Sequence, residues 1–90
     1  MTQDKAAQLA AAFRDRFGGE VETHPGDDGE TGRFDFSVVS PGFTGMSNLQ
    51  RQDAVWETID RILSREETLD VGMVWTFAPG EVDEWIRGLA

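Results

Sequence analysis

Apolar residues recur at four-residue intervals near the beginning of the chain. Leu9, Phe13 and Phe17 follow this spacing, with alanines beside them, and such a repeat is typical of one face of a helix. A threonine that can cap the helix precedes the repeat, and two glycines that can end the helix follow it. The pattern predicts a helix over residues 2–17.

Two segments then alternate between apolar and polar positions, as strands do. Residues 33–40, RFDFSVVS, alternate clearly, whereas residues 20–24 hold one strong apolar residue, Val21. The residues at 25–32, PGDDGETG, are turn formers, charged or flexible. We therefore expect an antiparallel hairpin whose two strands are joined by this loop.

A second helical pattern covers residues 47–65, with a serine or an asparagine available as the cap. Val55, Ile59 and then Ile62 or Leu63 form the stripe that we expect to face the core. An interruption close to the start would divide this region into a short helix and a longer one.

Residues 69–77 alternate most regularly, which predicts a third strand. The odd-numbered positions are all apolar, so we expect the helices to cover the face that carries Leu69, Val71, Met73, Trp75 and Phe77. Asp70 and Thr76 would then lie on the open face. A final helix is expected from Ala78 onwards, because a proline in its first turn is followed by acidic residues.

The helical region between the second and third strands forms a crossover, which makes these two strands parallel. The predicted fold is a single α+β domain over residues 1–90 in the order α-β-β-α-(α)-β-α. It contains a three-stranded mixed sheet with the helices packed on one face. The open face would carry polar side chains such as Asp35 and Ser37.

Composition and charge narrow the range of functions. The 90 residues include 17 acidic and 8 basic side chains, which gives a formal net charge of −9 and favours a basic protein partner. Nucleic-acid binding is not expected, because it relies on Lys and Arg to neutralise phosphates. The sequence has no cysteine, which excludes disulfides and thiolate chemistry. The first 17 residues resemble neither a signal peptide nor a membrane span, so we expect a cytoplasmic protein without membrane contact.

Catalytic constellations are scarce, and we expect no enzyme. His24 is the single histidine, and no nucleophile-elbow pattern surrounds any serine. The paired carboxylates lie in charged, solvated runs, which do not suit acid–base catalysis. Residues 42–45, GFTG, match the G-x-x-G of KH nucleic-acid modules. A strand-to-helix turn with Phe43 in the core explains the same residues better.

The run from Phe34 to Arg51, FDFSVVSPGFTGMSNLQR, resembles the core signature of the BolA family. In that family a strand ending in Val-Val-Ser precedes a loop with Phe and Gly, then a Ser, an apolar residue and an Arg that opens the long helix. The Thr-x-x-Pro-x-Glu spacing at 76–81 extends the resemblance, which covers roughly residues 34–85. It implies the α-β-β-α-α-β fold related to class II KH domains.

The resemblance also implies a partner and a cofactor. BolA proteins share an iron–sulfur cluster with a monothiol glutaredoxin, and the corresponding ligand positions here are His24 and Asp70, the latter replacing a family histidine. A carboxylate matches an iron–sulfur centre less well than imidazole does. We therefore expect no cofactor in the isolated protein and keep the shared cluster as a hypothesis. The candidate partner contacts lie in the loop and at the start of the long helix: Gly42, Phe43, Thr44, Gly45 and Arg51.

The resulting hypothesis is a non-enzymatic, BolA-like accessory or regulatory protein that acts through protein–protein contacts, with a glutaredoxin-type partner. Two alternatives stay open. One is a KH-like nucleic-acid-binding module, which the net charge opposes. The other is a divergent domain that kept the fold and lost the family function.

Overall fold

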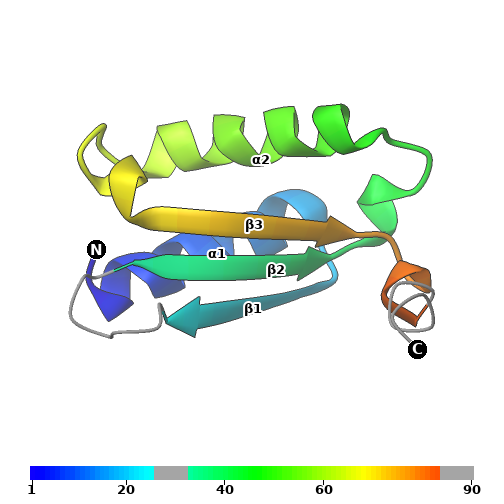
Figure 1. Ribbon diagram of the computed structural model, residues 1–90, viewed down its shortest axis with the longest axis horizontal. Coiled ribbons are helices and arrows are strands. Elements are labelled where there is room, and N and C mark those ends of the chain that lie inside the picture. The colour runs from blue at the N-terminus through cyan, green and yellow to red at the C-terminus, as the bar shows by residue number, and fades with distance from the viewer. Residues whose placement is uncertain (26–32, 84–90) are drawn as a thin grey trace.

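The computed structural model describes residues 1–25 and 33–83. The elements follow the predicted order (Figure 1), with η marking a short 3-10 helix: α1 (Gln3–Phe17), β1 (Glu20–Pro25), β2 (Phe34–Val39), η1 (Pro41–Phe43), α2 (Asn48–Ile62), η2 (Glu67–Asp70) and β3 (Val71–Phe77). A helical turn begins at 81–83, and the rest of the expected final helix lies outside the described residues.

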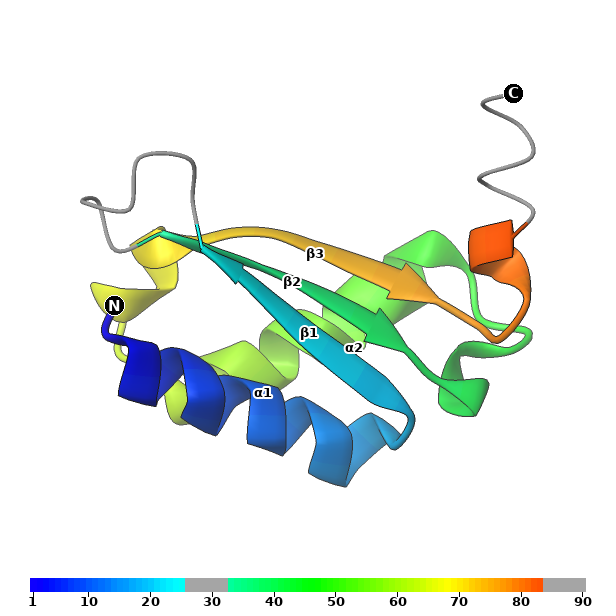
Figure 2. The same ribbon diagram turned by 90° about the horizontal axis from the view of Figure 1, so that it is seen from below.

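The three strands form one sheet in the order β1-β2-β3. β1 and β2 are antiparallel, whereas β2 and β3 are parallel, as a crossover through α2 requires. Both α1 and α2 lie against the same face of the sheet, and the opposite face is free of these two helices (Figure 2). The predicted α+β fold, with a three-stranded mixed sheet and helices on one face, is confirmed.

Local chemistry sets the ends of α1. The Oγ1 atom of Thr2 accepts a hydrogen bond from the backbone N–H of Lys5 at 3.1 Å, which satisfies one of the free donors of the first turn. Gly18 ends the helix with a φ of 69°, a value that glycine adopts at little cost. Leu9 and Phe13 are fully buried, so the predicted apolar face of this helix is confirmed.

α2 begins with a capping box formed by Ser47 and Gln50. The N–H of Gln50 donates to Ser47 Oγ at 3.2 Å, and the N–H of Ser47 donates to Gln50 Oε1 at 2.9 Å. The helix continues to Ile62 without the expected interruption. It ends three residues earlier than predicted because Leu63 adopts an extended backbone. The inward stripe is buried as predicted: Val55, Ile59 and Leu63.

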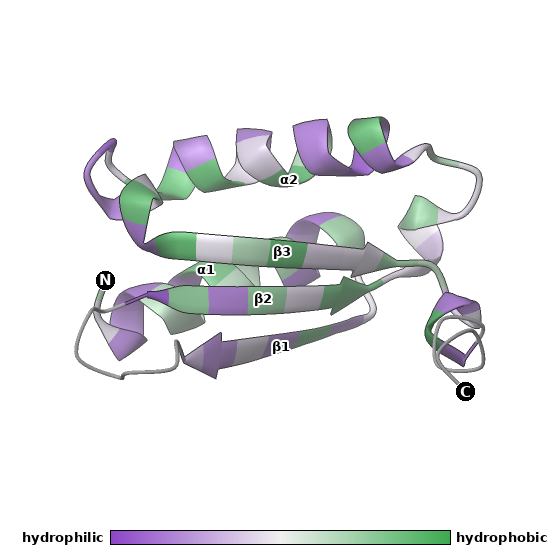
Figure 3. Cartoon of the chain, in the orientation of Figure 1, coloured by the Kyte–Doolittle hydropathy of each residue, from purple (hydrophilic) through white to green (hydrophobic). Residues whose placement is uncertain are grey.

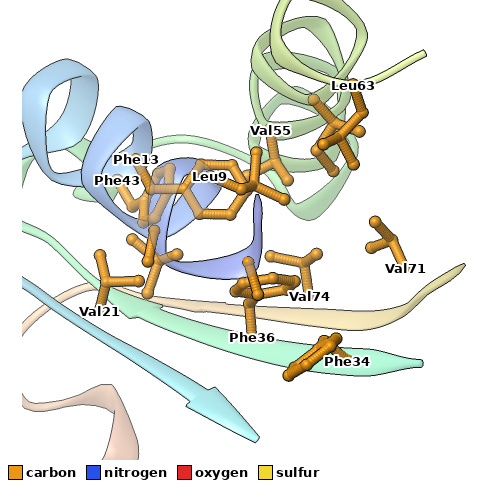
Figure 4. Packing of buried hydrophobic residues seen from close by; sticks show 14 of the residues in the cluster. Leu9, Phe13, Val21, Phe34, Phe36, Phe43, Val55, Leu63, Val71 and Val74 are labelled. Carbon is orange, nitrogen blue, oxygen red and sulfur yellow. The ribbon is translucent and has the colours of Figure 1, made fainter. Parts of the chain in front are cut away.

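The core lies between the sheet and the two helices, and side chains from all three strands point into it (Figure 4). The rings of Phe13 and Phe36 meet edge to face with centroids 5.7 Å apart, an arrangement that aromatic pairs favour. Phe43 from η1 is also fully buried and joins this cluster. Aromatic side chains therefore supply much of the buried area in a chain without disulfides.

The third strand departs from the predicted alternation at its second and third residues. Gly72 and Met73 together lie opposite the single residue Asp35 of β2, which defines a β-bulge. Side chains that follow the bulge point to the face opposite to the one that unbroken alternation gives. Met73 and Trp75 are consequently 58% and 37% exposed. The prediction that the helices cover them is wrong.

The bulge also reverses the expected positions of the even-numbered residues. Val74 and Thr76 are buried under the helices, although Thr76 was expected on the open face. Leu69 and Asp70 do not belong to the strand, because they lie in η2. Asp35 and Ser37, by contrast, are half-buried on the open face, as predicted.

Candidate interaction surface

His24 projects from β1 on the open face, where its side chain is 47% exposed. Its Nε2 atom lies 3.4 Å from Ser37 Oγ and 3.6 Å from Glu22 Oε2. A catalytic triad needs its carboxylate on the ring nitrogen opposite the serine, whereas here both groups approach the same nitrogen. These three residues therefore lack the arrangement of a hydrolase triad.

Asp70, the second candidate ligand, does not project from the open face as expected. Its carboxylate accepts a hydrogen bond from the amino group of Met1, and Met1 packs against the core cluster. His24 thus projects from β1, whereas Asp70 lies in η2 and is bound to the N-terminus. Within residues 1–25 and 33–83, no group of three His, Cys, Asp or Glu residues is placed to hold a metal ion. Ligation of a shared iron–sulfur cluster by His24 and Asp70 stays a prediction.

The glycine-flanked turn at 42–45 combines buried and exposed residues. Phe43 is fully buried, with its ring centroid 4.9 Å from that of Phe17, so the candidate contact at Phe43 is wrong and its assignment to the core is confirmed. Gly42, Thr44 and Gly45 are exposed. Their contact with a partner stays a prediction.

Arg51 has a structural role that sequence reasoning missed. Its Nε atom donates to the carbonyl of Met46 at 3.1 Å, and Nη1 donates to the carbonyl of Thr76 at 3.3 Å. The guanidinium also donates to both carboxylate oxygens of Glu81, at 2.6 and 3.0 Å. With 11% of its side chain exposed, Arg51 ties the turn, the end of β3 and the segment after β3 together. Its contact with a partner stays a prediction.

Glu81 is held in its charged form by these contacts. The guanidinium of Arg51, and then the backbone N–H of Ala78, lower the pKa of the Glu81 carboxyl to about 2. The same hydrogen bond raises the pKa of Arg51. The pair is therefore ionised throughout the neutral range, and bidentate geometry of this kind is the strong form of an ion pair.

Side chains from the helices bind carbonyl groups on both outer strands of the sheet. On β1, Arg14 donates to the carbonyl of Val21 at 3.2 Å. On β3, Gln52 donates to the carbonyl of Val74 at 3.0 Å, and Arg51 binds the next outward carbonyl. Capped edge groups are less available for pairing with a further strand. The exposed face of the sheet is thus better placed for a partner than either edge.

The open face carries an apolar row on β3 and an acidic row on β1. Met73 and Trp75 are exposed on β3, whereas Glu20 and Glu22 are exposed on β1. In Figure 3, β1 is coloured hydrophilic along most of its length. Large exposed apolar side chains gathered on one face are characteristic of interaction surfaces.

A hollow of about 360 Å³ lies on this face beside the segment that follows β3. Apolar and acidic side chains line it together: Val39, Phe77, Val82, Glu20, Glu22 and Asp83. None of the described lining residues is basic. The hollow therefore combines apolar and negatively charged lining residues.

The comparisons with known proteins agree with the fold. The BolA domain of SufE1 from Arabidopsis thaliana matches with a TM-score of 0.66 and 19% identity, over 90% of this chain and 99% of that chain. BolA1 from Arabidopsis thaliana matches with a TM-score of 0.61 and 16% identity, over 86% of this chain and 92% of that chain. The chain thus has a BolA-like fold, as its sequence pattern predicted.

Sequence comparison gives no further assignment. No family model matches the chain, and no curated protein matches it. None of the helices that the described residues form is long and apolar enough to cross a membrane.

The exposed row on β3 is the feature that sequence reasoning missed. Strict alternation assigned Met73 and Trp75 to the core, and the signal against this was Gly72. A glycine inside a strand often marks a bulge or a place where another group comes close to the backbone. The structure contains the bulge, and the Asp35 side chain occupies the space beside Gly72, because a Cβ atom there would lie 2.0 Å from Asp35 Oδ1.

Proposed function

We propose that the protein is a non-enzymatic, BolA-like accessory protein that binds another protein through the open face of its sheet, in the cytoplasm. The observation that carries this proposal is the exposure of Met73 and Trp75 on a strand whose remaining central side chains are buried. Aromatic residues are frequent anchors of protein interfaces. The capped carbonyls of β1 and β3 favour binding on the face over pairing at an edge.

The environment of His24 in the described part of the chain supports a binding role. The chain has one histidine and no cysteine, and His24 is exposed and not oriented as a general base by a carboxylate on its second nitrogen. These residues are compatible with a surface that makes contacts without performing chemistry.

A monothiol glutaredoxin is the partner that we propose to test first, because the sequence resembles the BolA family between residues 34 and 85. Since the Asp70 carboxylate is already bound to the amino group of Met1, the proposed complex does not depend on cluster ligation by His24 and Asp70. For the same reason, Asp70→His should not create a cluster site with His24. An absorption spectrum of the loaded glutaredoxin that is equally unchanged by the wild type and by Asp70→His would support this view.

The experiment compares two variants of exposed residues. Trp75→Thr removes the aromatic anchor from the open face and keeps a residue that suits a strand. Leu49→Ala is the matched control, because Leu49 is 71% exposed at the start of α2 and lies away from this face. Calorimetric titration with the glutaredoxin should show binding that Trp75→Thr weakens and Leu49→Ala preserves. A complex that neither substitution affects, or no complex with the wild type, would contradict the proposal.

A further inference from the structure

The open face is ordered into rungs that run across the three strands. One rung runs from Glu22 through Ser37 to Trp75. The next runs from Glu20 through Val39 to Phe77. Each of these two rungs has a carboxylate at one end and an aromatic ring at the other. The face therefore distinguishes its two sides by charge.

The two rows are separated by a distance that suits a helix. Neighbouring strands lie about 4.8 Å apart, so the rows on β1 and β3 are roughly 10 Å apart. A helix with its side chains is about 10–12 Å wide. A helix lying along β2 would place one flank over Glu20 and Glu22 and the other over Trp75.

The length of the face also suits a short helix. β2 has six residues, which span about 20 Å. A helix of about 14 residues has nearly the same length. The hollow at the end of the face adds a place for a long side chain whose stem contacts Val39 and Val82 and whose charged end reaches the carboxylate of Asp83. Lysine and arginine combine an apolar stem with a charged end in this way.

We infer that the open face binds a basic amphipathic helix of the partner protein, with the helix's apolar side on Met73 and Trp75 and its Arg or Lys side chains on Glu20 and Glu22. This inference rests on the proposed function and adds the chemistry of the partner. Charge complementarity supports it, since the chain carries a net charge of −9 and no basic residue lines the described part of the hollow. A second copy of this chain would instead carry the same net charge of −9, which like-charge repulsion opposes.

The test uses fluorescein-labelled helical peptides of about 14 residues that share one leucine face and differ in the flank. One peptide carries arginine at the flanking positions, the second glutamine and the third glutamate. Fluorescence anisotropy with the full chain should show the tightest binding for the arginine peptide, weaker binding for glutamine and none for glutamate. Added salt should weaken the binding of the arginine peptide more than that of the glutamine peptide.

Variants of the protein then locate the binding site. Glu20→Gln with Glu22→Gln should weaken the arginine peptide roughly tenfold and leave the glutamine peptide nearly unchanged. Asp53→Asn with Asp60→Asn is the matched control, because it removes the same charge from exposed positions on α2. This control pair should change the affinity by less than about twofold.

Three results would overturn the inference: equal weakening by both pairs of variants, equal affinity for the arginine and glutamine peptides, or no binding of the arginine peptide. If the arginine peptide does not bind while Trp75→Thr still weakens the binding of a protein partner, the inference about the basic helix is wrong and the proposed function stands. If Trp75→Thr affects neither the peptide nor the protein partner, both this inference and the proposed function fail.

Discussion

The Oδ1 atom of Asp35 accepts a hydrogen bond from the backbone N–H of Met73 at 2.8 Å. This contact joins β2 to the bulge of β3 and places a carboxylate where Gly72 has no side chain. The bulge turns Met73 and Trp75 outward and Val74 inward, so it determines which side chains the open face presents.

The fit between Asp35 and Gly72 gives the first prediction. A Cβ atom at Gly72 would lie 2.0 Å from Asp35 Oδ1, so Gly72→Ala should lower the free energy of unfolding by about 1–3 kcal/mol. Urea denaturation of Gly72→Ala, Asp35→Ala and the double variant measures the coupling between the two sites. In the Asp35→Ala background, the Gly72→Ala substitution should lower the free energy of unfolding by much less. An additive result would show that the clash is not with this carboxylate.

The reversal of faces on β3 gives the second prediction. Met73→Asp should change the free energy of unfolding by less than about 0.5 kcal/mol, as an exposed substitution does. Val74→Asp buries an unpaired charge and should cost several kcal/mol or prevent folding, on the order expected for such burial. Thermal melting of the two single variants compares adjacent positions. If Met73→Asp strongly lowered the melting temperature and Val74→Asp did not, β3 would follow the unbroken alternation and the assignment of its faces would be wrong.

The exposure of Met73 and the burial of Val74 also show how far the sequence predicts the structure. Periodicity and caps give the order of elements, the start of α2 at Ser47 or Asn48 and the burial of Phe36, because each depends on neighbours along the chain or on a strong local alternation. The bulge depends on a carboxylate 37 residues before Gly72, and a pattern within one strand does not contain that partner. An alternation with large apolar residues at every second position therefore predicted the wrong face.

The candidate site shows the same division between local and distant information. His24 lies near the end of β1, within the segment that the sequence predicted as the first strand, and its side chain is 47% exposed. Arg51 was expected to contact a partner, but its partner within the chain, Glu81, lies 30 residues away. The resemblance to the BolA family includes both Arg51 and Glu81, but only the folded structure shows that the Arg51 guanidinium binds the Glu81 carboxylate.

The ion pair between Arg51 and Glu81 predicts a dependence of stability on pH. The pKa of Glu81 falls from its ordinary value of 4.5 to about 2 in the folded protein. The pair therefore stabilises the fold above pH 4.5, and this contribution is lost as the pH falls from there through about 2. The difference in unfolding free energy between the wild type and Glu81→Gln should shrink over that range. Chemical denaturation at pH 7 and at stepwise lower pH measures it, and a constant difference would contradict the assignment.

Nucleic-acid binding should be weak or absent, because the chain carries a net charge of −9 and the guanidinium of Arg51 is bound to Glu81. Titration with single- and double-stranded DNA and RNA at low salt is the most permissive test, since electrostatic binding is strongest there. Micromolar binding that weakens with added salt would favour the KH-like alternative instead.

The central claim, that the open face of the sheet binds a protein, is tested most directly by nuclear magnetic resonance. The ¹⁵N-labelled chain is titrated with an unlabelled monothiol glutaredoxin, and the backbone amide and tryptophan indole signals are followed. We predict that the Trp75 indole and the amides of Glu22 and Ser37 shift, while the amides of Asp15 on α1 and Asp60 on α2 do not. Shifts confined to the two helices, or no shift at any position, would contradict the claim.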